Sequence, residues 1–164
     1  MLPKVAKSEM RAVVQRVARA KVIVDDPVPG QVTGQIEKGL LVYLGVGKTD
    51  TIADRAYILD KIANLRIFEN DAGKFDKSVE DVGGSILIVS QFTLYGDVSR
   101  GRRPSFDDAM PPAEAEAEYK AFVSAARSKL GDARVATGRF RAHMIVSSDV
   151  DGPVTIWIDS TKTG

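Results

Sequence analysis

The chain has 164 residues, a formal net charge of +1, no cysteine and one histidine. A chain of this length is most simply one domain, and the lack of cysteine excludes disulfides, thiolate nucleophiles and thiolate-bound metals. With His143 as the only histidine, a His-rich metal site is excluded, and a Ser-His-Asp triad could use that residue alone. We therefore expect no metal and no cofactor, and the simpler interpretation of His143 is an exposed or satisfied side chain.

The hydropathy of the chain and the composition of its first residues indicate the bounds of the domain and the cellular location. Residues 1–9 are mixed and lysine-bearing, without the apolar stretch of a signal peptide. We interpret them as a disordered extension before a single domain of residues 10–164. No apolar run approaches the roughly 18 residues of a membrane span. A cytoplasmic protein without a membrane partner is expected.

The N-terminal part of the chain predicts strands and turns. Residues 11–17 and 20–25 are β-branched segments of strand length. A turn rich in proline and glycine leads to residues 31–37, where apolar and polar residues alternate. Residues 40–46 then form a near-continuous apolar run, which is typical of a buried central strand.

Helical and extended patterns follow. Apolar residues recur at helical spacing from residue 51 to residue 65, which predicts a helix. Residues 86–89 are apolar enough to form a buried strand. A second helical pattern begins after Pro111-Pro112 and ends at Gly131.

The chain closes with two further expected strands, residues 142–147 and 154–159, joined by a loop that contains Gly152 and Pro153. Many strands, two helices and hairpins at both ends indicate an α/β domain with a mixed sheet rather than a regular βαβ repeat. No glycine-rich phosphate-binding signature opens either helix, so a nucleotide-binding fold is not expected.

The polar residues after the 86–89 strand form the main candidate site. Buried polar groups cost free energy unless they are paired, so Ser90, Gln91 and Thr93 at the end of a buried strand indicate a site. If the strand continues, Ser90 and Phe92 share one face, and Gln91 and Thr93 share the other. Their side chains or backbone N–H groups could hold an oxyanion. A polar strand end that satisfies a neighbouring loop would explain the same residues.

Two weaker signals accompany this segment. A bond such as Gly152–Pro153 can be cis at a tolerable cost, although a plain loop before an edge strand is the simpler interpretation. Arg100, Arg102 and Arg103 form the only compact basic cluster of the chain. Their guanidinium groups could bind phosphates, or they could belong to a solvated loop. Because the whole chain is almost neutral, any RNA binding has to rest on such a local patch.

Two motifs of the chain resemble the D-aminoacyl-tRNA deacylase family, often called D-tyrosyl-tRNA deacylase. They are Ser90-Gln91-Phe92-Thr93-Leu94 and Gly152-Pro153-Val154-Thr155. The similarity extends from residue 10 to about residue 159 and includes further blocks in the same order, at residues 10–17, 39–42, 64–68 and 101–106.

The resemblance implies a three-layer α/β/β fold with mixed sheets and two main helices. It also implies an esterase that releases D-amino acids, and possibly glycine, from the 3′ end of tRNA. Family members are homodimers with active sites shared between subunits. A Gly-cisPro pair, here Gly152 and Pro153, enters the pocket of the other subunit, binds the substrate α-amino group and excludes an L side chain.

The resemblance also assigns expected roles to the candidate residues. Ser90, Gln91, Phe92 and Thr93 form the catalytic strand end, in which amides around Gln91 and Phe92 fit the oxyanion role. Leu94 belongs to the substrate site. Thr93 could be a nucleophile or a spectator, and we favour the spectator because no base is evident to deprotonate it. The expected tRNA contacts are Arg100, Arg102 and Arg103.

Three positions depart from the family pattern. Val150 stands where the family usually has Asn, and Arg141 and His143 stand where it commonly has Gly and Asp. Two other classes of function stay open at this point. One is a non-catalytic RNA-binding module that uses the arginine cluster. The other is a small-molecule esterase or amidase, which would need a base that the chain does not evidently provide.

Overall fold

The structure is a computed structural model, and it describes residues 9–161. Its strands are β1 (Arg11–Val24), β2 (Gln31–Ile36), β3 (Gly39–Gly45), β4 (Phe68–Glu69), β5 (Phe75–Lys77), β6 (Ser85–Ser90), β7 (Val135–Thr137) and β8 (Ile145–Asp159). Its helical segments are α1 (Ile52–Asn64), the short 3₁₀ helix η1 (Phe92–Tyr95), α2 (Pro112–Leu130) and the 3₁₀ helix η2 (Asp132–Arg134). Residues 1–8 of the expected N-terminal extension lie outside the described residues.

The strands form one mixed sheet built around the long strand β1. The first half of β1 pairs antiparallel with β3, and its second half pairs antiparallel with β2. Strand β8 runs antiparallel along the other edge of β1. The β3–β6 and β6–β7 pairs are parallel, so the mixed sheet is confirmed. The sheet curls until β2 meets β7, where the Thr33 hydroxyl donates to the Thr137 carbonyl at 3.3 Å.

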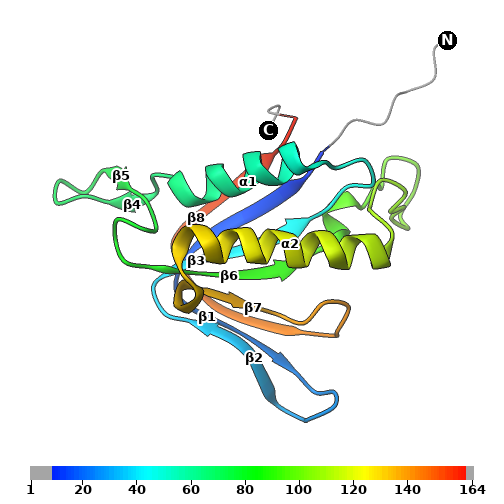
Figure 1. Cartoon of the computed structure of the whole chain (residues 1–164), viewed down its shortest axis with the longest axis horizontal. Coiled ribbons are helices and arrows are strands. Elements are labelled where there is room, and N and C mark those ends of the chain that lie inside the picture. The colour runs from blue at the N-terminus through cyan, green and yellow to red at the C-terminus, as the bar shows by residue number, and fades with distance from the viewer. Residues whose placement is uncertain (1–8, 162–164) are drawn as a thin grey trace.

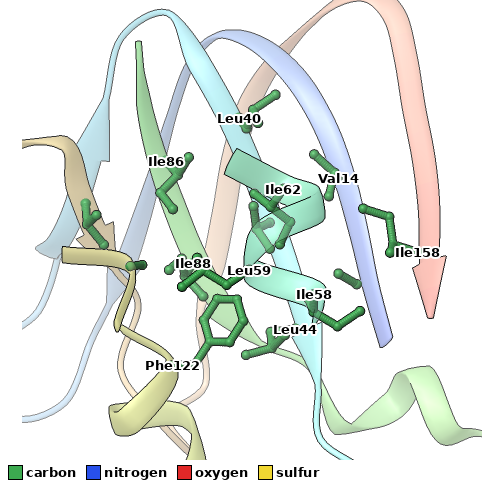
Figure 2. Close-up of a cluster of buried hydrophobic side chains, with 14 of the residues drawn as sticks. Val14, Leu40, Leu44, Ile58, Leu59, Ile62, Ile86, Ile88, Phe122 and Ile158 are labelled. Carbon is green, nitrogen blue, oxygen red and sulfur yellow. The ribbon is translucent and has the colours of Figure 1, made fainter. Parts of the chain in front are cut away.

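The central strands β3 and β6 are buried on both faces, which produces three layers. One set of alternate residues faces α1 and α2, which lie side by side on one side of the sheet (Figure 1). Figure 2 shows Leu40, Ile86 and Ile88 packed there against α1 and Phe122 of α2. The other set faces a second core beneath the curled half of the sheet, and consists of Leu41, Leu87 and Val89. This arrangement confirms the expected α/β/β fold.

Both main helices begin and end where local chemistry dictates. At the start of α1, the Thr51 N–H donates to the Asp54 carboxylate at 2.8 Å, which completes a capping box. Helix α2 has Pro112 in its first turn and ends at Gly131, whose φ of +99° suits glycine. None of the described helices is long and apolar enough to cross a membrane.

The prediction of two separate C-terminal strands is wrong, because β8 is assigned as one strand from Ile145 to Asp159. Strand β1 is likewise continuous over the two predicted segments 11–17 and 20–25. Each strand gives the other a long partner edge, and the pairing continues on both sides of the local break signals. The Gly152-Pro153 segment is still irregular: Gln15 pairs with Thr155 and Val17 with Val150, so four residues of β8 oppose Arg16 alone.

Candidate active site

The polar segment after β6 turns away from the sheet instead of continuing it. Strand β3 ends at Gly45, and the last bond along its edge runs from the Gln91 N–H to the Leu44 carbonyl at 2.8 Å. Without a partner strand beyond this point, the backbone bonds to itself, with Leu94 N–H to Gln91 O at 3.2 Å and Gly96 N–H to Thr93 O at 3.0 Å. The expected strand alternation of residues 90–93 is therefore wrong, since β6 ends at Ser90 and η1 begins at Phe92.

A pocket of about 430 Å³ opens beside this turn. Ser90 and Phe92 line it from the turn, and the start of α2 and the loop before it supply most of the other walls. Phe92 is 57% exposed and packs edge to face on Phe106, with ring centroids 5.1 Å apart. The remaining lining residues are Val46, Ala109, Met110, Pro111, Pro112, Ala115, Phe140 and Arg141. The pocket is largely apolar with few polar groups, as small-ligand sites usually are.

Gln91 and Thr93, the other polar residues of the predicted site, lie outside this lining. The Gln91 side-chain amide donates to the Thr93 hydroxyl. Within residues 9–161, no histidine or carboxylate hydrogen-bonds to the hydroxyl of Ser90 or Thr93. His143 lines a different hollow, together with Asp25 and Asp26. The described site thus holds hydroxyl groups without a general base in contact with them.

The backbone N–H groups of the turn divide into occupied and free groups. The Gln91 N–H donates to the Leu44 carbonyl at 2.8 Å, so it is already occupied in this structure. The next two N–H groups, of Phe92 and Thr93, donate to no acceptor in the described part of the chain. They are the first N–H groups of η1 and have no helical acceptor available. Any backbone oxyanion site of this turn is therefore formed by these two groups.

The Arg11 side chain supports the turn by a hydrogen bond to η1, and it was not identified from the sequence. Its guanidinium donates to the Leu94 carbonyl at 2.7 Å and pairs with the Glu9 carboxylate. It also lies over the rings of Tyr95 and Trp157, at 4.7 and 5.6 Å from their centroids. Leu94, expected in the substrate site, contributes this carbonyl and does not line the pocket.

A partly buried carboxyl lies next to this brace. Asp50 accepts hydrogen bonds from the Glu9 N–H at 2.9 Å and the Gly47 N–H at 2.7 Å. Burial nevertheless raises the pKa of Asp50 to about 7. Burial also raises the pKa of Tyr95, whose hydroxyl donates to the carbonyls of Glu9 and Gly45. Tyr95 is thus a structural hydrogen-bond donor behind the turn.

The Gly152–Pro153 bond is cis and lies on the irregular part of β8. Gly152 has a φ of +133°, and a Cβ atom there would lie 2.7 Å from a methyl group of Val154, so glycine is required. Arg16, a buried cation missed in the sequence, donates from Nε to the Asp151 carbonyl at 3.1 Å and from Nη1 to the Ile67 carbonyl at 2.8 Å. The Gly152-Pro153 motif is therefore exposed, and the adjacent Asp151 carbonyl is bound by the buried Arg16 side chain.

The structure does not bring Gly152 and Pro153 to the Ser90 pocket of the same chain. Both residues are exposed, and neither lines that pocket. Val150, the departure from the family pattern, is 37% exposed beside them.

The arginine cluster lies on a loop beyond the turn. Backbone bonds between Asp97 and Ser105, at 2.8 and 2.9 Å, close the base of this loop. The exposed residues on it are Arg100, Arg102 and Arg103, and they form no ion pair with any described residue. None of them lines the Ser90 pocket. Residues 9–161 also contain no group of acidic or histidine side chains that could hold a metal ion.

The chain is similar to known proteins in both sequence and fold. The family model described as D-Tyr-tRNA(Tyr) deacylase matches residues 13–159. Proteins named D-aminoacyl-tRNA deacylase from Thermotoga petrophila and Alkaliphilus metalliredigens are 54% and 53% identical, over 93% and 94% of this chain and 99% of each relative.

Two solved structures share the fold. One, named c-Myc DNA Unwinding Element Binding Protein, has a TM-score of 0.84 and 42% identity, and covers 90% of this chain and 97% of its own. The other is described as a probable eukaryotic D-amino acid tRNA deacylase. It has a TM-score of 0.78 at 20% identity, over 92% of this chain and 99% of its own, and supports the fold alone. The chain belongs to the D-Tyr-tRNA(Tyr) deacylase family.

Proposed function

We propose that the protein hydrolyses the ester between a D-amino acid and the 3′ end of tRNA. The observation that carries this proposal is the turn at residues 90–95. It offers two free backbone N–H groups beside a largely apolar pocket and has no general base in contact with its hydroxyls. Such a site suits an ester that is already activated, because it orients the substrate and stabilises developing charge.

In the proposed reaction, water attacks the ester carbonyl carbon and the neighbouring ribose 2′-hydroxyl assists the attack. The carbonyl oxygen becomes an oxyanion, which the N–H groups of Phe92 and Thr93 stabilise. Cleavage of the bond to the ribose oxygen then releases a free D-amino acid and uncharged tRNA. Ser90 lines the pocket wall, and the Gln91 side-chain amide donates to the Thr93 hydroxyl.

Selection for the D form is assigned to Gly152 and Pro153 of a second copy of the chain. Three features support this assignment: the motif is exposed, it is fixed by Arg16, and it lies away from the pocket of its own chain. Its backbone carbonyls would bind the α-amino group and leave no space for an L side chain. Glycine, which has no side chain, would be accepted as well.

The remaining parts of the proposal concern tRNA and location. Arg100, Arg102 and Arg103 are exposed cations without described ion-pair partners, and we assign them to phosphates of the tRNA. The active form is a homodimer with two shared sites. Because charged tRNA is used in the cytoplasm, the reaction takes place there.

The experiment is a comparison of ester loss from D-tyrosyl-tRNA and L-tyrosyl-tRNA under the same conditions, with glycyl-tRNA as a third substrate. We expect rapid loss of the D ester, measurable loss of the glycyl ester and no acceleration for the L ester. Equal rates for D and L esters would contradict the assignment of chirality. Absence of hydrolysis would contradict the proposed function itself.

A second candidate function is nucleic-acid binding without hydrolysis. The exposed arginine loop favours it, as does the 42% identity to a protein named for binding the c-Myc DNA unwinding element. Retained tRNA affinity in a protein that hydrolyses none of the three esters would support this alternative. Affinity that vanishes when the three arginines are replaced by glutamine would locate the binding surface.

A further inference from the structure

A second hollow, of about 640 Å³, runs along α2 beside the candidate active site. One wall is the side of α2 from Glu116 to Ser128, and the other is the segment from Thr137 to Phe140. At about 1.5 Å per residue, this stretch of helix is about 18 Å long. Phe140 lines both this α2 groove and the Ser90 pocket, so the two hollows share a wall.

The side chains that line the α2 groove carry one more positive charge than negative charge. Its ionisable side chains are Glu116, Lys120, Arg127, Asp132 and Arg139, apart from the buried Tyr119. Lys120 pairs with Glu116 at 3.5 Å, so these two charges offset each other. Arg139 donates to the neutral carbonyl of Asp26 at 2.8 Å and keeps its charge. Arg127 forms no side-chain bond with any described residue, so Arg127 and Arg139 line the groove with Asp132 as the remaining carboxylate; Arg139 also lines the neighbouring hollow that contains Asp25 and Asp26.

A further cation stands at the junction of the two hollows. Arg141 lines the Ser90 pocket next to Phe140 and has no ion pair or hydrogen bond within residues 9–161. Its backbone φ of +62° lies in the left-handed region, which non-glycine residues rarely adopt. Such conformations concentrate at functional sites. Arg139 and Arg141 thus flank Phe140 at the border between pocket and groove.

We propose that the α2 groove binds the single-stranded 3′ end of the tRNA acceptor, with Arg127 and Arg139 contacting its phosphates. This inference rests on the proposed function, because it assumes that the esterified terminal nucleotide occupies the Ser90 pocket. A pocket of 430 Å³ holds the amino acid and part of that nucleotide, so the preceding nucleotides have to leave across the surface. The groove begins at the shared Phe140 wall, and its cations and hydroxyl groups match a phosphate backbone.

Hydroxyl side chains complete the recognition surface. Ser124, Ser128 and Thr137 line the groove between its charged groups, and serine and threonine hydroxyls are common donors to phosphate oxygens. Contacts to phosphates of this kind do not depend on the nucleotide sequence. The arginine loop at residues 98–104 is a separate surface and is assigned to phosphates farther from the reacting end.

The test compares a groove variant, Arg127→Gln with Arg139→Gln, with a matched control, Lys61→Gln with Lys129→Gln. The control removes the same charge from exposed positions of α1 and α2 that do not line the groove. Two substrates are used: full-length D-tyrosyl-tRNA, and the D-tyrosyl ester of adenosine, which reaches only the pocket. Because Arg139 also bonds to Asp26, Arg127→Gln alone is measured as well.

For the groove variant we expect at least a tenfold higher KM with tRNA, an unchanged kcat, and an unchanged rate with the adenosine ester. The slope of log kcat/KM against log salt should become less negative by about 1.4, since each single-strand phosphate contact contributes about 0.7. Arg127→Gln alone should give about half of that change. An equal effect in the control, or an equal loss with the adenosine ester, would overturn the proposal.

A binding measurement separates this proposal from the proposed function. An uncharged acceptor-stem hairpin with a single-stranded CCA end is titrated by fluorescence anisotropy against the same hairpin with a blunt end. The overhang should strengthen binding to the wild type and the control at least tenfold, but have little effect on the groove variant. Failure of this pattern refutes the groove whatever the catalytic result, whereas its success without hydrolysis would leave the groove standing and refute only the deacylase.

Discussion

Replacing Thr93 with alanine tests the chemistry of the turn, because Thr93 is the one side chain of the motif that could act as a nucleophile. Its hydroxyl is exposed and its described hydrogen bond is to the Gln91 amide, which cannot remove a proton. A neutral hydrogen bond contributes about 0.5–1.5 kcal/mol, so complete loss of this bond in the transition state would slow the reaction about two- to tenfold. Loss of a true nucleophile costs about 10⁴- to 10⁶-fold.

The assay is single-turnover hydrolysis of D-tyrosyl-tRNA with enzyme in excess, which reports the chemical step. Thr93→Ser keeps the hydroxyl and serves as the matched control. We expect both variants to remain within about tenfold of the wild type, because a spectator hydroxyl contributes no more than its hydrogen bond. A loss above 1,000-fold in Thr93→Ala, with Thr93→Ser active and both proteins folded, would refute the reasoning.

Three other changes follow from the geometry. In Arg16→Lys, a single ammonium group replaces the two guanidinium nitrogens that donate to the carbonyls of Asp151 and Ile67. Loss of one charged hydrogen bond should lower the ratio of the D-ester rate to the L-ester rate about tenfold or more. An unchanged ratio would contradict the bracing role. Phe122→Ala removes a fully buried ring and should cost about 3–5 kcal/mol in urea unfolding, whereas Ser124→Ala on the exposed side of α2 should cost under about 0.5 kcal/mol. Burial raises the pKa of Asp50 to about 7 from an ordinary 3.8, so the folded state holds this proton more tightly than the unfolded state. The resulting contribution to stability is complete below about pH 3.8, falls as the pH rises from about 3.8 to 7, and is absent above that range. The unfolding free energy of the wild type should therefore fall relative to that of Asp50→Asn between pH 5 and pH 8. A constant difference between the two proteins would show that Asp50 is not the group responsible.

Much of the fold could be predicted from the sequence because it depends on local patterns. The apolar runs of β3 and β6 and the helical spacing of α1 and α2 mark elements whose periodicity is set by burial. The breaks were less predictable. The sequence predicts a loop at Gly152-Pro153, but β8 continues past this segment because β1 supplies a long partner edge.

The candidate site was predictable in its position but not in its geometry. Ser90 and Phe92 do line a pocket, but the segment leaves the sheet because β3 ends, which no residue of the segment itself reveals. Arg11 and Arg16 were missed for a related reason. Their acceptors, the carbonyls of Leu94 and Asp151, lie 83 and 135 residues away along the chain, so only the folded strand β1 brings them together.

If each chain supplies half of an active site, two different inactive variants should restore activity when they form mixed dimers. Gly152→Ala disrupts a backbone that requires glycine, and Ser90→Trp fills the pocket, so each variant alone should be inactive. The two variants, carrying different tags, are co-expressed and the mixed dimers are assayed on D-tyrosyl-tRNA.

If Gly152 of one copy completes the pocket of the other, a mixed dimer contains one wild-type site out of two. Random pairing makes half of the dimers mixed, so the co-expressed pool should recover about a quarter of the wild-type activity. Activity no higher than that of either variant alone, in dimers shown by their two tags to be mixed, would contradict the shared site.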